Sequence, residues 1–119
     1  MEHINQQNRI RYCQTLDLKN DDHLIEEYKY WHKSENIWPE IPRGIREVGI
    51  LDMEIYIFGN RLFMIIETAA DFDWDASFTD LADKERQKEW ETFVSKFQVS
   101  AEDASSSDKW QLMERIFKL

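Results

Sequence analysis

Tyr28 and His32 are four residues apart in a stretch, residues 28–40, that is rich in aromatic side chains. In a helix this spacing places the phenol and the imidazole on one face, one turn apart. A phenol can hydrogen-bond a ligand, and histidine has an ordinary pKa of about 6.5, so it exchanges protons near neutral pH. The pair therefore suits general acid–base chemistry on a small polar ligand. Aromatic residues at helical spacing also commonly just face a core, and spacing alone leaves both interpretations open.

Other kinds of chemistry find little support in the sequence. The three glycines are not spaced as a phosphate-binding loop. The three histidines (His3, His23 and His32) have no carboxylates at a recognised metal-ligand spacing, so no metal site is expected. Cys13 is expected to be a small buried residue of a strand rather than a nucleophile. No cofactor motif is present, and we expect a reaction that needs neither metal nor cofactor.

Composition restricts the class of protein and of partner. A chain of 119 residues with 42% hydrophobic residues is expected to form one domain over residues 1–119, with residues 1–7 as a loose polar lead-in. A net charge of −9 argues against nucleic acid or an anionic membrane as partner, but not against a neutral sugar. The lone Cys13 fits a reduced, cytoplasmic setting, and neither an export signal nor a membrane-spanning run is evident.

The first half of the chain predicts the elements that position this pair. Alternating apolar and polar residues over 9–17 predict a strand. Asn20 is a plausible N-cap for the following helix, which carries Tyr28 and His32 on its apolar stripe. A second short helix is expected to start at Pro39 and to stop at Gly49.

The second half predicts a hairpin, two helices and a last strand. Residues 50–58 and 61–68 read as strands joined by the two-residue turn Gly59-Asn60. Residues 71–82 are expected to form a short helix that leads into a longer one over 83–97, with Trp90 on its apolar side. Residues 100–108 are expected to be a loop, and 109–119 a last strand, although that pattern would also tolerate a helix.

This order of elements predicts an α+β fold of the ferredoxin-like, split-βαβ type. In that arrangement a four-stranded antiparallel sheet carries its helices on one face. The other face must also be covered, and two such sheets facing each other would form a dimeric α/β barrel. Three strand carboxylates (Asp52, Glu54 and Glu67) are expected beside the first helix, although each could equally belong to a polar strand face.

The chain resembles the L-rhamnose mutarotase family over nearly its whole length. The resemblance is carried by Tyr28-x-x-x-His32, Trp38-Pro39-Glu40, Ile55-Tyr56, Trp90 and the terminal Ile116-Phe117-Lys118-Leu119, in matching order and with similar spacing. It implies a dimeric ferredoxin-like barrel that interconverts the α and β anomers of a 6-deoxy-hexose. It also implies that His32 is the proton donor, that Tyr28 contacts the sugar and that Trp90 lines the pocket.

The sequence departs from the family pattern at two positions. A Trp-Trp pair of the family corresponds to Glu89-Trp90 here, and a sugar-contacting tyrosine of the second strand corresponds to Met53. Both departures concern the groups that contact hydroxyls, so they bear on the identity of the sugar more than on the reaction. The second strand and the hairpin are also similar to a branch of the family associated with L-fucose, and the sequence leaves L-fucose and L-rhamnose open.

The resemblance leads to a hypothesis with two alternatives. His32 would deliver a proton to the ring oxygen of a monosaccharide, while water or a carboxylate such as Glu89 acts as base. The protein would thus be an isomerase, an aldose 1-epimerase, that works as a homodimer. The first alternative is a non-catalytic module that binds a small ligand. The second is a cofactor-independent monooxygenase of the same architecture, which would take an apolar substrate.

Overall fold

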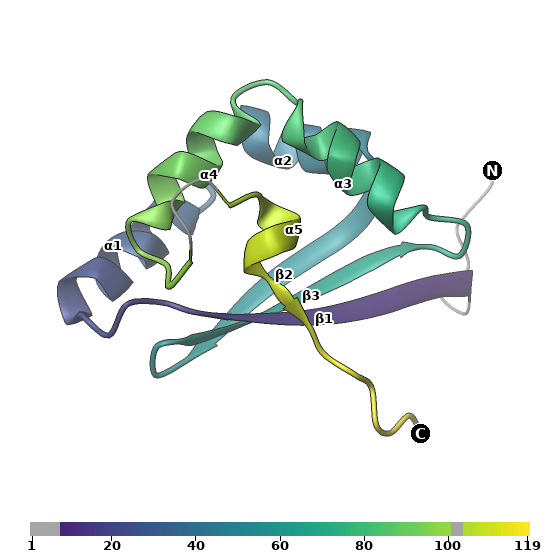
Figure 1. Ribbon diagram of the computed structural model, residues 1–119, viewed down its shortest axis with the longest axis horizontal. Coiled ribbons are helices and arrows are strands. Elements are labelled where there is room, and N and C mark those ends of the chain that lie inside the picture. Colours follow the sequence, from purple (N-terminus) through teal and green to yellow (C-terminus); the bar gives the residue numbers. More distant parts are fainter. Residues whose placement is uncertain (1–7, 101–103) are drawn as a thin grey trace.

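The computed structural model describes residues 8–100 and 104–119, and within them helices gather on one side of an antiparallel sheet (Figure 1). The elements, in chain order, are β1 Arg9–Asp17, α1 Asp22–His32, α2 Glu40–Glu47, β2 Ile50–Phe58, β3 Arg61–Ala69, α3 Trp74–Ala82, α4 Gln87–Ser95, α5 Ser106–Lys109 and β4 Gln111–Leu112. Residues 1–7, expected as a polar lead-in, and His3 among them lie outside the described residues. None of the helices described is long and apolar enough to cross a bilayer.

The sheet has the strand order β2-β3-β1-β4, with every neighbouring pair antiparallel. This is the predicted split-βαβ arrangement, because β3 lies between β1 and β2 and the chain crosses from β1 to β2 through α1 and α2. The Gly59-Asn60 turn closes the predicted hairpin between β2 and β3, and Gly59 has a φ of 63°, which glycine adopts without strain. The predicted ferredoxin-like fold is confirmed.

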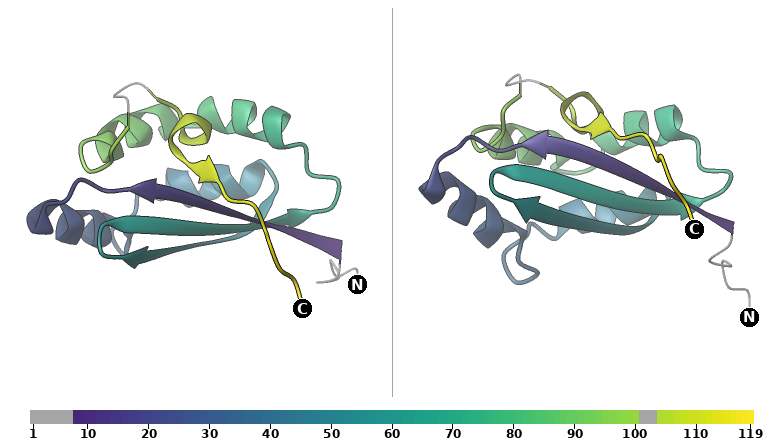
Figure 2. Two further views of the ribbon diagram at one scale, coloured as in Figure 1. Left: turned by 60° about the horizontal axis from the view of Figure 1, so that its bottom comes forward. Right: turned by 90° about the horizontal axis from the view of Figure 1, so that it is seen from below.

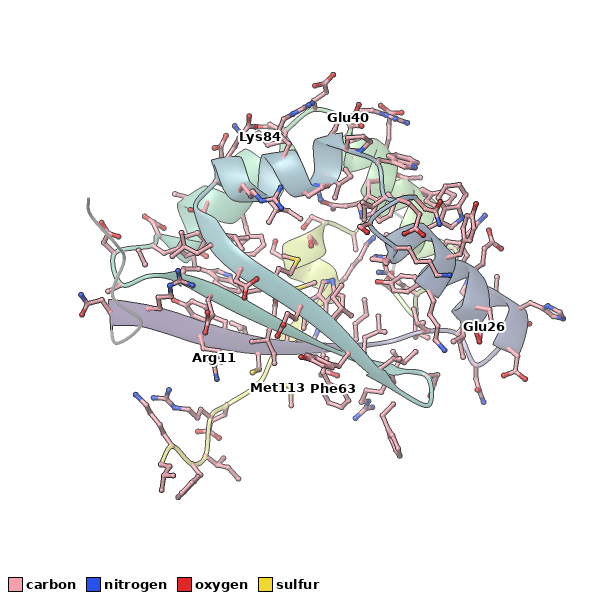
Figure 3. All side chains as sticks on the ribbon, turned by 180° about the vertical axis from the view of Figure 1, so that it is seen from behind. Arg11, Glu26, Glu40, Phe63, Lys84 and Met113 are labelled. Carbon is pink, nitrogen blue, oxygen red and sulfur yellow. The ribbon has the colours of Figure 1, made fainter. Side chains whose placement is uncertain are left out.

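Alternation along the strands divides the sheet into a helix-covered face and a bare face. Leu62, Met64 and Ile66 of β3 are buried under the helices, as are Leu16 and Leu18 near the end of β1. The odd-numbered residues of β3, among them Phe63, point the other way, where no helix lies across the strands (Figure 2). Figure 3 places Arg11, Phe63 and Met113 on that bare face, and Glu40 and Lys84 on the helix side.

Helix α1 begins one residue later than the sequence predicted. Asp21, not Asn20, is the N-cap, because its Oδ1 accepts a hydrogen bond from the Leu24 backbone N–H at 3.0 Å. The helix packs Tyr28 into the core and ends at His32. The second predicted helix is also present: Pro39 is the N-cap of α2, and Gly49 follows its C-cap with a φ of 99°.

The prediction of a long helix over residues 83–97 is wrong about where the helix starts. Helix α4 begins at Gln87, after a break at which Arg86 adopts the left-handed conformation with a φ of 62°. The break is held by tertiary contacts of the Arg86 side chain: its guanidinium lies 4.1 Å from the centre of the Trp38 ring and 3.7 Å from a Glu40 carboxylate oxygen. The sequence contains no glycine or proline at residues 83–86 that would signal such a break.

The end of the chain also differs from its prediction. Part of the predicted loop is the short helix α5, capped by Ser105 and Asp108. The predicted strand over 109–119 is reduced to Gln111–Leu112, which pairs with Gln14 and Thr15 of β1. Beyond Met113, whose N–H donates to the Cys13 carbonyl at 2.8 Å, the chain extends away from the sheet edge as an unpaired tail (Figure 1).

Candidate functional site

The last two turns of α1 bring Tyr28 and His32 into direct contact. The two rings stack with their centroids 4.1 Å apart and an interplanar angle of 28°. This is the geometry that the i, i+4 spacing predicts for one helical face. Tyr28 is buried, with 4% of its surface exposed, and burial raises the pKa of its hydroxyl. The phenol is therefore a neutral hydrogen-bonding group at physiological pH.

A backbone contact fixes the protonation pattern of His32. Its Nδ1 lies 2.7 Å from the Tyr28 carbonyl oxygen. Because a carbonyl oxygen can only accept, Nδ1 carries the proton, and the lone pair of the neutral ring is on Nε2. Desolvation by burial lowers the pKa of His32, and the hydrogen bond to Tyr28 opposes it only in part. The neutral imidazole is thus the resting form at neutral pH, with Nε2 able to take a proton.

Trp90 of α4 also contacts the imidazole. Its ring centroid lies 5.3 Å from that of His32 in an edge-on arrangement, and 6% of its surface is exposed. Trp38 packs against Trp90 with the centroids 5.1 Å apart, and it carries the Arg86 guanidinium on its ring. Trp38 is not among the residues that line the cavity beside His32, so it packs behind the wall that Trp90 forms.

A cavity of about 100 Å³ lies between the helices and the sheet and is lined by Tyr28, His32 and Trp90 together. Apolar side chains form the floor, among them Ile55 of β2 and Met64 of β3. Pockets for drug-sized ligands measure roughly 300–1,000 Å³, so this one suits a smaller molecule. His32 also lines two grooves outside the cavity, one beside α2 and β2 and one beside the β2–β3 hairpin, so its ring stands between the cavity and solvent.

A buried polar cluster lies on the wall that α4 and α5 contribute to the cavity. Gln87 donates from Nε2 to a Glu91 carboxylate oxygen at 2.7 Å, and Lys109 donates from Nζ to the Glu91 backbone carbonyl at 2.7 Å. All three side chains line the cavity and are at most 8% exposed. Desolvation lowers the pKa of Lys109 and Glu91 raises it in part. The cavity thus combines apolar and aromatic walls with one strongly polar wall.

The three site residues chosen from the sequence (Tyr28, His32 and Trp90) are brought together in this cavity, and Met53 lines it as well. Other predicted candidates lie elsewhere. The Glu89 side chain is 66% exposed, and it forms a 3.7 Å ion pair with Arg86 rather than facing the cavity. A neighbour on the same helix, Glu91, supplies a cavity carboxylate instead.

The strand carboxylates expected beside the first helix do not belong to the cavity. Glu67 pairs with Arg9 and Arg11 on the bare face of the sheet. Glu54 is exposed and accepts a hydrogen bond from the Tyr56 hydroxyl. Asp52 lies at an irregularity of β2, where its carboxylate accepts from the Met53 N–H and lines the outer groove that His32 also reaches.

Sequence reasoning missed the polar wall. Gln87 precedes Trp90 by three residues and Glu91 by four, so polar residues beside the apolar stripe of that helix were the available signal. Lys109 carried no signal, because it was placed in a predicted strand rather than in a helix. His23 is exposed, and Cys13, which was expected to be buried, is half-buried.

Comparison with known proteins agrees with this geometry. The sequence model of the L-rhamnose mutarotase family matches residues 11–119. The chain belongs to the L-rhamnose mutarotase family. A protein named L-fucose mutarotase from Xanthomonas campestris is 34% identical over 109 residues, which covers 92% of this chain and 87% of that protein. A protein named L-rhamnose mutarotase from Burkholderia ambifaria is 30% identical over 86 residues, 71% of this chain and 77% of that protein.

Solved structures support the fold of this mutarotase-family chain. An L-rhamnose mutarotase from Formosa agariphila superposes with a TM-score of 0.68 at 21% identity, covering 92% of this chain and 98% of the other. The tetracenomycin F2 cyclase of Streptomyces glaucescens, a polyketide cyclase, superposes with a TM-score of 0.54 at 15% identity, covering 92% and 96%. At these identities both likenesses concern the fold alone.

Proposed function

We propose that this chain is a sugar mutarotase that interconverts the α and β anomers of a 6-deoxy-L-hexose, L-fucose or L-rhamnose. Membership of the family and the names of its relatives support the reaction. The observation that carries the proposal is the His32 ring, whose Nδ1 is held by a backbone carbonyl and whose neighbours in the cavity are Tyr28 and Trp90. The reaction makes the protein an isomerase.

In the proposed mechanism His32 exchanges a proton with the sugar through Nε2. The anomeric hydroxyl oxygen and the ring oxygen are bonded to the same carbon, so one nitrogen can reach both. Nε2 takes the proton of the anomeric hydroxyl, the resulting imidazolium gives a proton to the ring oxygen, and the bond between that oxygen and the anomeric carbon breaks. Rotation about the bond between the first two carbons and the reverse steps give the other anomer.

The surroundings of His32 suit this role. Burial lowers the pKa of the imidazole, so the ring begins neutral and its protonated form gives up a proton more readily than an ordinary imidazolium does. In the proposal the Tyr28 hydroxyl holds a sugar hydroxyl, and the Trp90 ring packs on the apolar face of the pyranose. Both rings contact the imidazole, one stacked and one edge-on, and both line the cavity in which the sugar would bind.

The polar wall of the cavity argues against the monooxygenase alternative. A monooxygenase with an apolar aromatic substrate would have to bury the Glu91 carboxylate and the Lys109 ammonium against that substrate without new hydrogen bonds, which is costly. A polyhydroxylated ligand can instead hydrogen-bond both groups. A binding module would bind the same sugar, and it differs from the mutarotase only in leaving the anomer exchange rate at its spontaneous value.

The first prediction concerns His32. Replacing it with asparagine should lower the catalysed anomer exchange of L-fucose or L-rhamnose by roughly 100-fold or more, the range in which general acid–base catalysis contributes. Saturation-transfer NMR measures the exchange directly. His23→Asn is a matched control, because His23 is an exposed histidine of the same helix. This variant should catalyse anomer exchange at the wild-type rate. Undiminished exchange in His32→Asn would contradict the proposed mechanism.

We further propose that the protein acts as a homodimer in which the bare sheet face of one subunit meets that of the other. Exposed apolar side chains support this proposal. Tyr56 and Phe58 of β2 are 54% and 83% exposed, and in the tail Ile116 and Phe117 are 90% and 74% exposed. The exposed aromatic side chains of the sheet face and the apolar tail are complementary, so a two-fold dimer would let each tail cover these aromatics on the partner's sheet.

A cytoplasmic setting is part of the same proposal. Its support is the free thiol of Cys13, since reducing compartments keep cysteines unpaired.

A further inference from the structure

Two glutamine side chains on the wall of the cavity each keep a buried oxygen without a hydrogen-bond partner. Gln98 is 2% exposed and Gln87 is 4% exposed, and both line the cavity. Within residues 8–100 and 104–119, no donor satisfies Oε1 of either side chain. Buried polar atoms nearly always have a partner, because an oxygen that has left water without a replacement costs free energy. Two such acceptors in one cavity therefore point to a ligand that supplies donors.

The amide nitrogens of the two side chains are already engaged, and this determines which atoms remain available. Gln87 donates from Nε2 to the Glu91 carboxylate at 2.7 Å. Turning this amide over would set its oxygen against a carboxylate oxygen, so Nε2 must face Glu91 and Oε1 stays available. Gln98 donates from Nε2 to the Tyr28 hydroxyl oxygen at 3.4 Å, a long contact. With the Gln98 amide in this orientation, the Tyr28 oxygen accepts and its hydroxyl proton is available to a ligand.

The two glutamines line the cavity from opposite ends of α4, one within the helix and one beyond it. Gln87 is the first residue of α4, whereas Gln98 lies three residues beyond its end and forms a bridge with Leu18. Trp90, which packs on the His32 ring, lies between them in sequence. Because the two side chains come from different segments that line one cavity, a pyranose bound there would present different hydroxyls to Gln87 and to Gln98.

We propose that Gln98 and Gln87 are specificity-determining residues, each accepting a hydrogen bond through Oε1 from a different ring hydroxyl of the sugar. The proposal rests on the mutarotase function proposed above, in that the ligand is a pyranose. It adds where the configuration of the ring is recognised: by acceptors at the start of α4 and just beyond its end, and not by the proton-transfer residues on α1. A site that offers a buried acceptor discriminates strongly against a ligand that has no donor there.

The experiment combines side-chain replacement with removal of single hydroxyls from the sugar. The affinities of wild-type protein, Gln98→Met and Gln87→Met for L-fucose and L-rhamnose are measured by protein-observed NMR titration. The monodeoxy analogues of the better-binding sugar are then titrated in the same way. Methionine is similar to glutamine in length and cannot accept a strong hydrogen bond. Gln14→Met is the matched control, since Gln14 is also 2% exposed but belongs to β1 and is not among the residues that line this cavity.

We expect each cavity variant to bind the parent sugar roughly tenfold more weakly, the effect of one hydrogen bond. For one monodeoxy analogue the same replacement should change the affinity by less than about twofold, because the partner hydroxyl is already absent. The monodeoxy analogue that is insensitive to the replacement should be a different one for Gln98→Met than for Gln87→Met. Gln14→Met should bind every sugar as the wild type does.

Several outcomes would overturn the proposal. One is an equal loss of affinity for the parent sugar and every analogue, combined with a lowered unfolding midpoint of Gln98→Met, because this identifies a structural role. Unchanged affinity in both cavity variants is another. A wild type that binds the sugar without accelerating anomer exchange would overturn the mutarotase function and leave this proposal standing. A wild type that binds neither sugar would overturn both.

Discussion

Two effects shift the pKa of the His32 imidazole in opposite directions. Burial disfavours the charged ring and dominates, whereas the Tyr28 carbonyl at 2.7 Å favours the protonated form. The spacing of Tyr28 and His32 made their contact predictable from the sequence. The protonation pattern was not predictable, because it depends on which ring nitrogen meets the carbonyl and on how deeply α4 buries the ring.

The lowered pKa of His32 predicts the pH dependence of activity. The neutral ring accepts the proton, so the catalysed exchange of L-fucose should keep its neutral-pH value as the pH falls through about 6.5, the ordinary histidine pKa. It should fall only below that value. Background-corrected exchange rates between pH 4.5 and 8 measure the profile. A half-maximal rate at or above pH 6.5 would mean that His32 is not the titrating group or that its pKa is not lowered.

The same shift has a consequence for stability with a definite sign. In the unfolded chain His32 takes up a proton near pH 6.5, whereas in the folded chain it does so only at lower pH. Its contribution to stability is therefore fully present above pH 6.5 and is lost as the pH falls through the folded-state pKa. Urea unfolding of wild type and His32→Asn at pH 7.5 and 5 should show a smaller loss of stability for the variant.

At the scale of elements, α1 and α4 hold the site, and their starts differ from the sequence expectation for different reasons. Asn20 and Asp21 are both good N-cap residues, so propensity alone could not choose between them. The start of α4 depends on Arg86, whose left-handed backbone is held by its contacts with Trp38 and Glu40. Such contacts join residues more than 40 positions apart, and helical periodicity carries no information about them.

The N-cap of α1 gives a paired prediction. Asp21→Ala should lower the free energy of unfolding by about 1 kcal/mol, because the Leu24 N–H loses its acceptor at the start of the helix. Asn20→Ala changes an exposed residue outside the helix and should alter stability by less than about 0.5 kcal/mol. Urea unfolding followed by circular dichroism compares the two variants. Equal effects, or a larger effect at Asn20, would show that the cap is not at Asp21.

At the scale of the whole molecule, the order of elements was enough to predict the sheet and the side on which its helices lie. Residues 62–66 of β3 are all apolar, so the sequence did not show which of them face the helices; in the structure Leu62, Met64 and Ile66 lie under the helices and Phe63 on the bare face. The tail was mispredicted because its apolar residues fit a strand, whereas in one copy of the chain only Gln111 and Leu112 find a partner strand. An apolar tail of this kind is consistent with a contact that the second subunit provides.

The proposed dimer can be tested on the bare face. Phe63→Asp places a charge in the middle of that face, next to Tyr56 of the neighbouring strand, and should convert the dimer to a monomer. Sedimentation velocity measures the change in mass. Tyr30→Asp is the control, because Tyr30 is an exposed residue of α1 on the helix side of the sheet and should leave the dimer intact. A monomeric wild type would contradict the dimer.

The division of work between two helices has a consequence for the divergence of this family. Tyr28 and His32 lie on α1, whereas Gln87, Trp90 and Glu91 lie on α4. In the proposed function, residues of α1 transfer the proton and residues of α4 recognise the sugar ring. Substitutions confined to α4 could therefore change the sugar specificity while the proton-transfer residues on α1 stay the same. A family member could then acquire a new substrate without an inactive intermediate in its evolution.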